Sequence, residues 1–296
     1  MRSLIIGASG KIGKIMYGKH FIKTYYKNKF EGGIKFNLLK DNVDIIIKKY
    51  NIKNVVLLSA ISDPDECLKK KNYSNLLNII KTKKLIDKLI NKKIFFIFFS
   101  TEYIFNGSSG NYNENSPVNP VNLYGKQKYI IENYIRNKTK NFCILRIAKT
   151  YGDDINDTTL ISSFLKNLIN GKNFFLIATD QKFSPLYVKD LKKIINLFLK
   201  KEVKGVFNLG GPEQLSRYDC INIILHLLGK KIKSKIIIKK TLIKNVTTLD
   251  KRPLDVSMDI KKIKKVINFK LKKFAAIANI IIEKNNAKYK ILKRRH

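Results

Sequence analysis

Three glycines spaced by two residues stand near the start of the chain and restrict the folds open to it. Gly7, Gly10 and Gly13 follow directly on the apolar run Leu4–Ile6. Glycines at this spacing let the backbone turn tightly from a strand into a helix and approach a pyrophosphate, which then lies at the helix N-terminus. A glycine turn without a ligand is the alternative. The candidate dinucleotide contacts are Gly7, Ser9, Gly10, Lys11, Ile12 and Gly13.

Apolar strands and amphipathic helices alternate along the first half of the chain. The expected strands after the first are 21–26, 54–59, 94–100 and 142–147, and the expected helices are 42–50, 67–91 and 124–137. Such alternation is typical of a doubly wound parallel sheet. The fully apolar run 94–100 suits a strand that is covered on both faces.

Beyond about Tyr151 the alternation is looser. Short strands are expected at 174–177 and 206–209, between helices at 160–168, 189–199 and 218–228. The sequence therefore predicts an α/β protein with a Rossmann-type domain over residues 1–150. A smaller α/β lobe is expected over residues 151–296, with late segments returning to the first domain. The lysine-rich tail after Glu283 is expected to be solvated.

The chain is strongly basic, with 60 Lys and Arg residues against 22 Asp and Glu and a formal net charge of +38. Such a charge is typical of nucleic-acid-binding proteins. However, only seven of these residues are arginine, and the lysines are spread over the whole chain among many Asn and Ile residues. AT-rich codons encode all three types, so we expect no specific nucleic-acid site. A nucleic-acid binder, with affinity that falls steeply with salt, is the alternative.

Polar residues that suit carbonyl chemistry follow strand 94–100 and begin the next helix. Ser100 and Thr101 stand at the carboxyl end of that strand, where open α/β sheets bind ligands. Tyr124 and Lys128 are four residues apart, so they share one helix face. A cation beside a phenol lowers the phenol pKa from about 10, which makes it a usable proton donor and acceptor. A hydroxyl that only caps its own loop and a chance Tyr–Lys spacing are the alternatives.

The chain resembles the extended short-chain dehydrogenases/reductases, and within them the dTDP-4-dehydrorhamnose reductases. The segments that resemble the family, in chain order, are GASGKIG, STEYIFNG, NLYGKQK, LRIAKTYG, DQKFSPLYVKDL, GVFNLGG and RPLDVSMDIKKI. The first is similar to GxxGxxG, the second to STDYVFDG and the third to the YGxxK helix. The resemblance implies an NADP-dependent oxidoreductase that reduces a 4-keto-6-deoxy nucleotide sugar, with dTDP-4-dehydro-L-rhamnose as the expected substrate.

The resemblance also implies roles for individual residues. Thr101, Tyr124 and Lys128 would form a catalytic triad: Tyr124 protonates the developing alkoxide, Lys128 holds the cofactor ribose, and Thr101 orients the carbonyl. Asn78 matches a helix asparagine that supports the lysine through water. Ser59 and Ala60 are expected to border the cofactor. The expected substrate contacts in the matching segments are Glu102, Asp180, Gln181 and Arg252.

Several positions differ from the family pattern. Strand 21–26 ends without an acidic residue for the adenosine 2′-hydroxyl, whereas Lys27 or Lys29 could meet a 2′-phosphate, so NADP is favoured over NAD. Glu102 stands where the family usually has Asp. Some relatives hold a divalent cation at a dimer interface. No matching carboxylate cluster is found in this sequence, so no metal is expected, and a homodimer is left open.

Two other functions are compatible with the same fold. One is a nucleotide-sugar reductase or epimerase that acts on another sugar. The second is a noncatalytic NADP-binding subunit, because SAISDPDEC and LNLYGK are similar to the regulatory β subunit of methionine adenosyltransferase. The longest apolar run, Ile94–Phe99, is far shorter than the roughly 20 residues of a membrane span, and no signal-peptide pattern is seen. A cytoplasmic protein is therefore expected.

Overall fold

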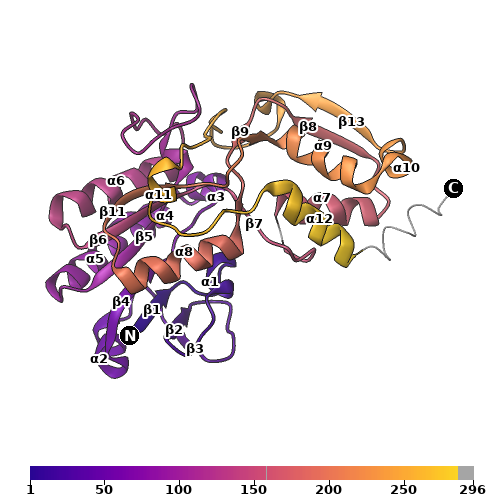
Figure 1. Cartoon of the computed structure of the whole chain (residues 1–296). Coiled ribbons are helices and arrows are strands. Elements are labelled where there is room, and N and C mark those ends of the chain that lie inside the picture. The colour runs from indigo at the N-terminus through magenta and orange to yellow at the C-terminus, as the bar shows by residue number, and fades with distance from the viewer. Residues whose placement is uncertain (158, 286–296) are drawn as a thin grey trace.

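The computed structural model describes residues 1–157 and 159–285, which form two lobes (Figure 1). A parallel β-sheet with helices on both faces makes the larger lobe. The smaller lobe consists mainly of helices beside a short two-stranded sheet. Most of the tail that is expected to be solvated, residues 286–296, lies outside the described residues.

In the described residues, the large sheet has seven strands in the order β11-β6-β5-β4-β1-β2-β3. Every neighbouring pair in it is parallel. Apart from β11 this is the strand order of a Rossmann fold, so the predicted doubly wound α/β sheet is confirmed. The strands are β1 (Arg2–Ile6), β2 (Phe21–Tyr25), β3 (Gly33–Lys35), β4 (Ile52–Leu57), β5 (Phe95–Thr101), β6 (Phe142–Ile147) and β11 (Gly205–Leu209).

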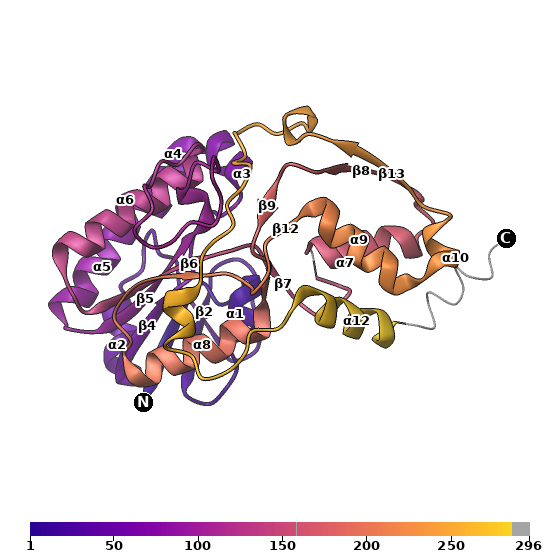
Figure 2. The ribbon, with the colours of Figure 1, turned by 45° about the horizontal axis from the view of Figure 1, so that its top comes forward.

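Two layers of helices cover the sheet because its central strands are apolar on both faces. In β5, Phe96 and Phe98 pack against α2 (Val43–Tyr50), α5 (Thr82–Asn91) and α6 (Leu123–Lys138). Phe95, Ile97 and Phe99 point to the other face, which α8 (Val188–Lys201) and α11 (Lys261–Lys264) cover. Figure 2 shows these two layers on opposite sides of the strands.

The single helix expected over residues 67–91 is wrong, because the structure breaks it into four parts. They are α3 (Pro64–Lys69), α4 (Lys71–Asn75), a π-helical segment (Leu76–Lys81) and α5. The Thr82 hydroxyl donates to the Leu77 carbonyl oxygen, five residues earlier, at 2.9 Å. This bond fits the wider turn of a π-helix. The wider turn directs Asn78 inward, where it is buried.

The small lobe has its own apolar core, to which α7, α9, α12 and β8 contribute. The expected strands and helices of this half agree with the structure to within two residues. Strands β7, β9, β10, β12 and β13 and helices α10, α11 and α12 were not predicted. The elements are β7 (Thr150–Tyr151), α7 (Leu160–Ile169), β8 (Phe174–Ala178), β9 (Lys182–Phe183), β10 (Leu186–Tyr187), β12 (Leu215–Ser216), α9 (Arg217–Leu228), α10 (Lys230–Lys233), β13 (Ile237–Thr241) and α12 (Phe274–Lys284).

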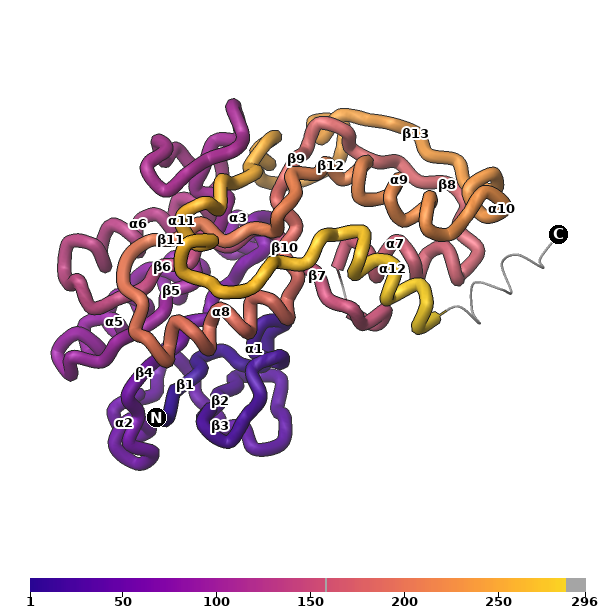
Figure 3. Tube along the Cα trace, viewed as in Figure 1, coloured from indigo at the N-terminus to yellow at the C-terminus, as the bar shows by residue number. Residues whose placement is uncertain are grey.

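The chain passes between the lobes several times (Figure 3). After β7 it builds α7, β8 and β9 and then returns to the large lobe for α8 and β11. It crosses again for α9 and β13, returns for α11, and ends its described part in α12. The elements α8, β11 and α11 thus belong to the large lobe although they follow residue 150. The predicted domain boundary at about residue 150, which separates the main part of the large lobe from the main part of the small lobe, stays a prediction.

Candidate active site

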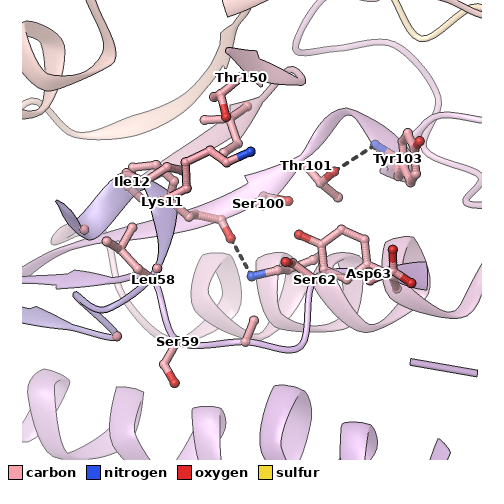
Figure 4. Close-up of a pocket in the computed structure, with 18 of the residues that line it drawn as sticks. Lys11, Ile12, Leu58, Ser59, Ser62, Asp63, Ser100, Thr101, Tyr103 and Thr150 are labelled. Carbon is pink, nitrogen blue, oxygen red and sulfur yellow. Dashed lines mark hydrogen bonds between the residues drawn. The ribbon is translucent and has the colours of Figure 1, made fainter. Parts of the chain in front are cut away.

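A cavity of about 650 Å³ opens at the carboxyl edge of the large sheet. Residues that follow β1, β2, β4, β5 and β6 line it, and Arg217 and Arg252 contribute from segments beyond β11. This is the edge at which open α/β sheets bind ligands. Figure 4 shows Lys11 extending toward Thr150, with Ser62 and Asp63 on the opposite wall.

Most of the predicted site residues meet at this cavity. Those that line it are Gly7, Ser9, Gly10, Lys11, Ile12, Gly13, Ser59, Ala60, Thr101, Glu102, Tyr124, Lys128 and Arg252. Four do not line it, and these are Lys27, Asn78, Asp180 and Gln181.

The glycine loop is shaped by close backbone contacts. Gly7 has a φ of +89°, and a Cβ there would lie 2.7 Å from the Ser59 nitrogen. Its N–H donates to the Thr24 hydroxyl, which in turn donates to the Ile5 carbonyl oxygen, both at 3.2 Å. Gly10 differs, because a Cβ there would meet only the Gly7 oxygen, at 3.6 Å. The backbone at Gly10 is therefore open toward the cavity.

The end of β2 contributes aromatic residues instead of the expected lysine. Tyr25 and Tyr26 line the cavity there, together with Phe36 directly after β3, whereas Lys27 is exposed and does not line it. In the sequence the two tyrosines are recognised only as the end of a strand. Their rings offer flat surfaces on which a planar base can pack.

Thr101 and Tyr124 are placed by neighbouring segments of backbone. Thr101 ends β5, and its Oγ1 accepts a hydrogen bond of 3.2 Å from the Tyr103 N–H. Asn122 caps α6 through a 2.8 Å bond from the Gly125 N–H, which fixes Tyr124 in the first turn. A Cβ on Gly125 would lie 2.1 Å from the Tyr103 oxygen, so glycine lets these two segments touch.

The expected lowering of the Tyr124 pKa is wrong. Burial raises the pKa of Tyr124 well above its usual value, and the hydrogen bond with the Thr101 side chain only partly opposes this. Lys128 does not reverse the effect, because its Nζ lies 5.8 Å from the centre of the Tyr124 ring. Tyr124 is therefore a protonated phenol at neutral pH, which suits a proton donor.

Lys128 is buried on the inner face of α6. Its Nζ donates to the Phe99 carbonyl oxygen at 2.7 Å and lies 4.7 Å from the centre of the Phe98 ring. Burial lowers the pKa of Lys128 to about 8. The ammonium thus sits between β5 and the cavity, and the N–H groups that do not bond Phe99 are available to a ligand hydroxyl.

Asn78 shapes the cavity wall from behind. Its Oδ1 accepts from the Ile61 N–H at 3.0 Å, and its Nδ2 donates to the Ile61 oxygen at 2.9 Å and to Gln127 Oε1 at 2.7 Å. Gln127 also donates to the Ser74 hydroxyl at 2.8 Å. The network holds the segment that follows Ala60 against α6. The expected support of Lys128 through water stays a prediction.

Glu102 lines the cavity beside Lys149, which lies in the segment LRIAKTYG but has no role assigned from the sequence. The Glu102 carboxyl is buried, one of its oxygens lacks a hydrogen-bond partner, and burial raises its pKa to about 8. Lys149, which also lines the cavity, opposes that rise through its charge. Burial and the Arg217 charge together lower the pKa of Lys149 to about 8.

The predicted substrate contacts of the small lobe have partners within the protein. Asp180 accepts the Ile243 N–H at 2.8 Å. The Gln181 Oε1 accepts the Arg217 Nε–H at 2.6 Å, and its Nε2 donates to the Pro253 oxygen at 3.3 Å. Arg252 lines the cavity but forms an ion pair with Asp65 at 3.0 Å.

We also searched the structure for groups of metal-ligating side chains and for helices that could span a membrane. Within residues 1–157 and 159–285, no group of three or more His, Cys, Asp or Glu residues is placed to hold a metal ion. In the same part of the chain, no helix is both long enough and apolar enough to cross a membrane.

Known proteins resemble the chain in both sequence and structure. Methionine adenosyltransferase 2 subunit beta of Xenopus tropicalis is 27% identical over 232 residues, which cover 74% of this chain and 69% of that protein. A hypothetical dTDP-4-dehydrorhamnose reductase from Sulfolobus tokodaii superposes with a TM-score of 0.78 at 24% identity, over 93% of this chain and 98% of the other. The dTDP-4-dehydrorhamnose reductase of Bacillus anthracis, in complex with NADP, has a TM-score of 0.79 at 16% identity, over 96% and 99%.

The family comparison covers nearly the whole length. The model of the RmlD substrate binding domain matches residues 1–286, which include the glycine loop, the Tyr124–Lys128 helix and both lobes. The chain therefore belongs to the RmlD substrate binding domain family.

Proposed function

We propose that the protein reduces a 4-keto-6-deoxy nucleotide sugar with NADPH, and that dTDP-4-dehydro-L-rhamnose is its substrate. The main support is that Thr101, Tyr124 and Lys128 line one cavity together with the glycine loop. The family match and the NADP bound to the Bacillus anthracis reductase support the choice of cofactor. NAD, which is bound in other structural relatives, is the alternative cofactor.

The residues present fit a dinucleotide. The open backbone at Gly10 leaves room for a pyrophosphate, which Lys11 would also contact, and Tyr25 and Tyr26 would enclose the adenosine end. Lys128 would hold the ribose next to the nicotinamide. When bound, the cofactor supplies the hydride.

The chain supplies orientation and a proton. The hydroxyls of Thr101 and Tyr124 interact with each other, so both can point at the same carbonyl oxygen. Thr101 orients the carbonyl, and Tyr124 gives its proton to that oxygen as negative charge develops on it. Because the Tyr124 pKa is raised, the phenol is protonated at the start of the reaction.

The test is NADPH oxidation by the purified protein with dTDP-4-dehydro-L-rhamnose. Tyr124→Phe should lower turnover by about 10²–10⁴-fold while NADPH binding is kept, because only the proton donor is removed. Tyr134→Phe is the matched control: it makes the same substitution on α6, at a tyrosine that bonds Asp87 away from the cavity. Unchanged turnover in Tyr124→Phe would reject the mechanism.

Two other functions give different results. A reductase or epimerase of another nucleotide sugar would turn over a different substrate, which product analysis identifies. A regulatory subunit is favoured by the 27% identity to methionine adenosyltransferase 2 subunit beta. Such a subunit would bind NADPH, but it would not oxidise NADPH with any of the keto sugars tested.

A further inference from the structure

Two cationic side chains of the cavity have no assigned role. Lys149 follows β6 in the large lobe, and Arg217 is the first residue of α9 in the small lobe. Both line the cavity that holds Thr101 and Tyr124, and both act electrostatically on the buried Glu102. They therefore lie near one another, on the side of the cavity where β5 ends.

The charges of these two side chains are not compensated by the protein. Among the described residues, neither Lys149 nor Arg217 forms an ion pair, and the Lys149 ammonium has no hydrogen bond to another side chain or to the backbone. Glu102 does not neutralise them, because burial raises its pKa to about 8 and so favours its neutral form at pH 7. Arg252 differs, since Asp65 already pairs with it at 3.0 Å.

Gln181 holds Arg217 in place. The Gln181 side chain is only 3% exposed and accepts the Arg217 Nε–H at 2.6 Å. The Arg217 N–H also donates to the Gln181 carbonyl oxygen at 3.3 Å, and Gln181 Nε2 is engaged by Pro253. Only Nε of the guanidinium is thus occupied, and its terminal N–H groups remain available to a ligand.

We infer that Lys149 and Arg217 form an anion-binding subsite for the nucleotide-sugar substrate, with Gln181 as a positioning residue. The inference rests on the proposed function, because it takes the occupant of this cavity to be a nucleotide sugar. A partly buried pair of cations without a counter-ion is costly, and an anion between them forms charge-assisted hydrogen bonds while neutralising them. The anion is the diphosphate of the nucleotide sugar or, if the sugar is not the 4-keto-6-deoxy sugar proposed above, a carboxylate on the sugar.

The experiment measures binding by calorimetry in saturating NADP⁺, so that the cofactor pyrophosphate is already bound. One pair of probes is dTDP and thymidine, which differ in the diphosphate. The other is UDP-glucuronic acid and UDP-glucose, which differ in the sugar carboxylate. The variants are Lys149→Met and Arg217→Met, and Lys201→Met, which removes an exposed lysine of α8, controls for net charge.

Each source of the anion predicts its own pattern. If the subsite takes the diphosphate, both variants bind dTDP at least about tenfold more weakly, equivalent to about 1.4 kcal/mol, while thymidine binding is unchanged. If it takes a carboxylate, both lose affinity for UDP-glucuronic acid but not for UDP-glucose. The inference would be overturned if Lys149→Met and Arg217→Met bound all four probes with wild-type affinity. It would also be overturned if they lost affinity equally for every probe and Lys201→Met showed the same loss. Lys149→Gln and Arg217→Gln replace any Met variant that does not fold.

A double-mutant cycle tests the role of Gln181. Gln181→Leu should weaken anion binding about as much as Arg217→Met does, and it should add nothing in the Arg217→Met background. A merely structural residue would lower the melting temperature and add its own loss of binding in both backgrounds. Additive losses would therefore remove Gln181 from the subsite.

The same measurements separate this inference from the proposed function. Turnover of a keto sugar with normal anion binding in the variants would reject the subsite and keep the reductase. A selective loss of anion binding in a protein that reduces no keto sugar would keep the subsite and reject the reductase.

Discussion

Gly10 and Gly13 belong to the same glycine-spaced loop, but an added methyl group would meet different surroundings at each. At Gly10 the nearest atom is the Gly7 oxygen, at 3.6 Å. At Gly13 the added Cβ would lie 2.3 Å from the Ala8 Cα and 2.4 Å from the Ala8 oxygen, both of which are backbone atoms. One glycine thus leaves space for a ligand, and the other lets two parts of the loop touch.

Alanine at each position should separate these roles. Gly13→Ala is expected to lower the free energy of unfolding by about 1–3 kcal/mol, because the backbone of Ala8 must move. Gly10→Ala should leave stability within about 0.5 kcal/mol of wild type. It should weaken NADP⁺ binding, because Gly10 lines the cavity and a methyl group there would hinder the close approach of a pyrophosphate. Urea unfolding and calorimetry of both variants measure the two effects. A Gly10→Ala protein that binds NADP⁺ normally would show that the pyrophosphate lies elsewhere.

Lys128 should make stability depend on pH. Its pKa is about 8 in the folded protein, against an ordinary value of 10.5, so the unfolded chain binds more protons between these values. The free energy of unfolding therefore rises with pH across this window, by at most about 3 kcal/mol, and the cost of the buried ammonium is fully present below pH 8.

The measurement compares urea unfolding of wild type and Lys128→Met from pH 7 to pH 10. Wild type should gain stability relative to the variant as the pH passes from 8 to 10, because only wild type carries this shifted group. Lys201→Met should show no such trend, since its lysine is exposed. A constant difference between wild type and Lys128→Met would contradict the prediction.

Among the elements, the π-helical segment connects the cavity wall with the helix that bears Tyr124. Asn78→Leu would leave the N–H and the oxygen of Ile61 and the Gln127 Oε1 without their present partners. Each buried group left in this way costs about 1–3 kcal/mol. We expect the melting temperature to fall and NADP⁺ binding to weaken. Asn167→Leu makes the same substitution at an exposed position of α7, outside this network, and is the matched control. Equal effects in both variants would argue against a special role of Asn78.

The elements that were predicted correctly have patterns that do not depend on tertiary contacts. Strand β5 begins with an uninterrupted apolar run, Phe95–Phe99, and α6 and α8 have distinct apolar and charged faces over three or more turns. Strand β13 was missed because IIKKT is mostly exposed and pairs only with β8. The π-helical segment Leu76–Lys81 was missed because apolar spacing does not show where the backbone bonds of a helix shift to the wider turn.

The part of the site that could be predicted likewise consists of local sequence patterns that do not depend on tertiary contacts. The glycine loop and the Tyr124–Lys128 pair are contiguous patterns, so spacing alone brings their members together. Gln181 was assigned to the substrate although its side chain bonds Arg217, because sequence order does not say which way a side chain points. Lys149, although it lies in the segment LRIAKTYG, and Arg217 receive no role from the sequence, because basic residues are abundant throughout the chain and these two influence each other only in the folded protein.

For the whole molecule, Asp65 links α3 of the large lobe to residues 249–252, of which Arg252 lines the cavity. Its Oδ1 accepts the N–H groups of Leu249 and Asp250 at 3.1 and 3.0 Å and pairs with Arg252. Asp250 in turn accepts the Leu123 N–H at the start of α6, at 2.9 Å. A single carboxylate on α3 thus positions a segment that contributes Arg252 to the wall of the cavity.

Asp65→Ala should weaken substrate binding without changing cofactor binding. We expect KM for the keto sugar to rise about tenfold, since losing these bonds costs about 1–2 kcal/mol. The affinity for NADP⁺ should be unchanged, because the glycine loop is not touched. Asp44→Ala removes ion pairs with Lys88 and Lys92 at the end of α5 and is the control. If Asp65→Ala also bound NADP⁺ about tenfold more weakly, the prediction that Asp65 affects only substrate binding would be wrong.

The late position of α8, β11 and α11 also determines when the large lobe can fold during synthesis. One face of β5 and β6 is covered largely by α8 and by the segment that contains α11, both of which follow residue 150. At about 5–20 residues per second, a ribosome needs on the order of ten seconds to make the chain from β6 to α11. During that time Phe95, Ile97 and Leu145 lack part of their native cover on that face. The nascent chain should therefore depend on chaperones, and a fragment ending at residue 150, which lacks both α8 and α11, should aggregate.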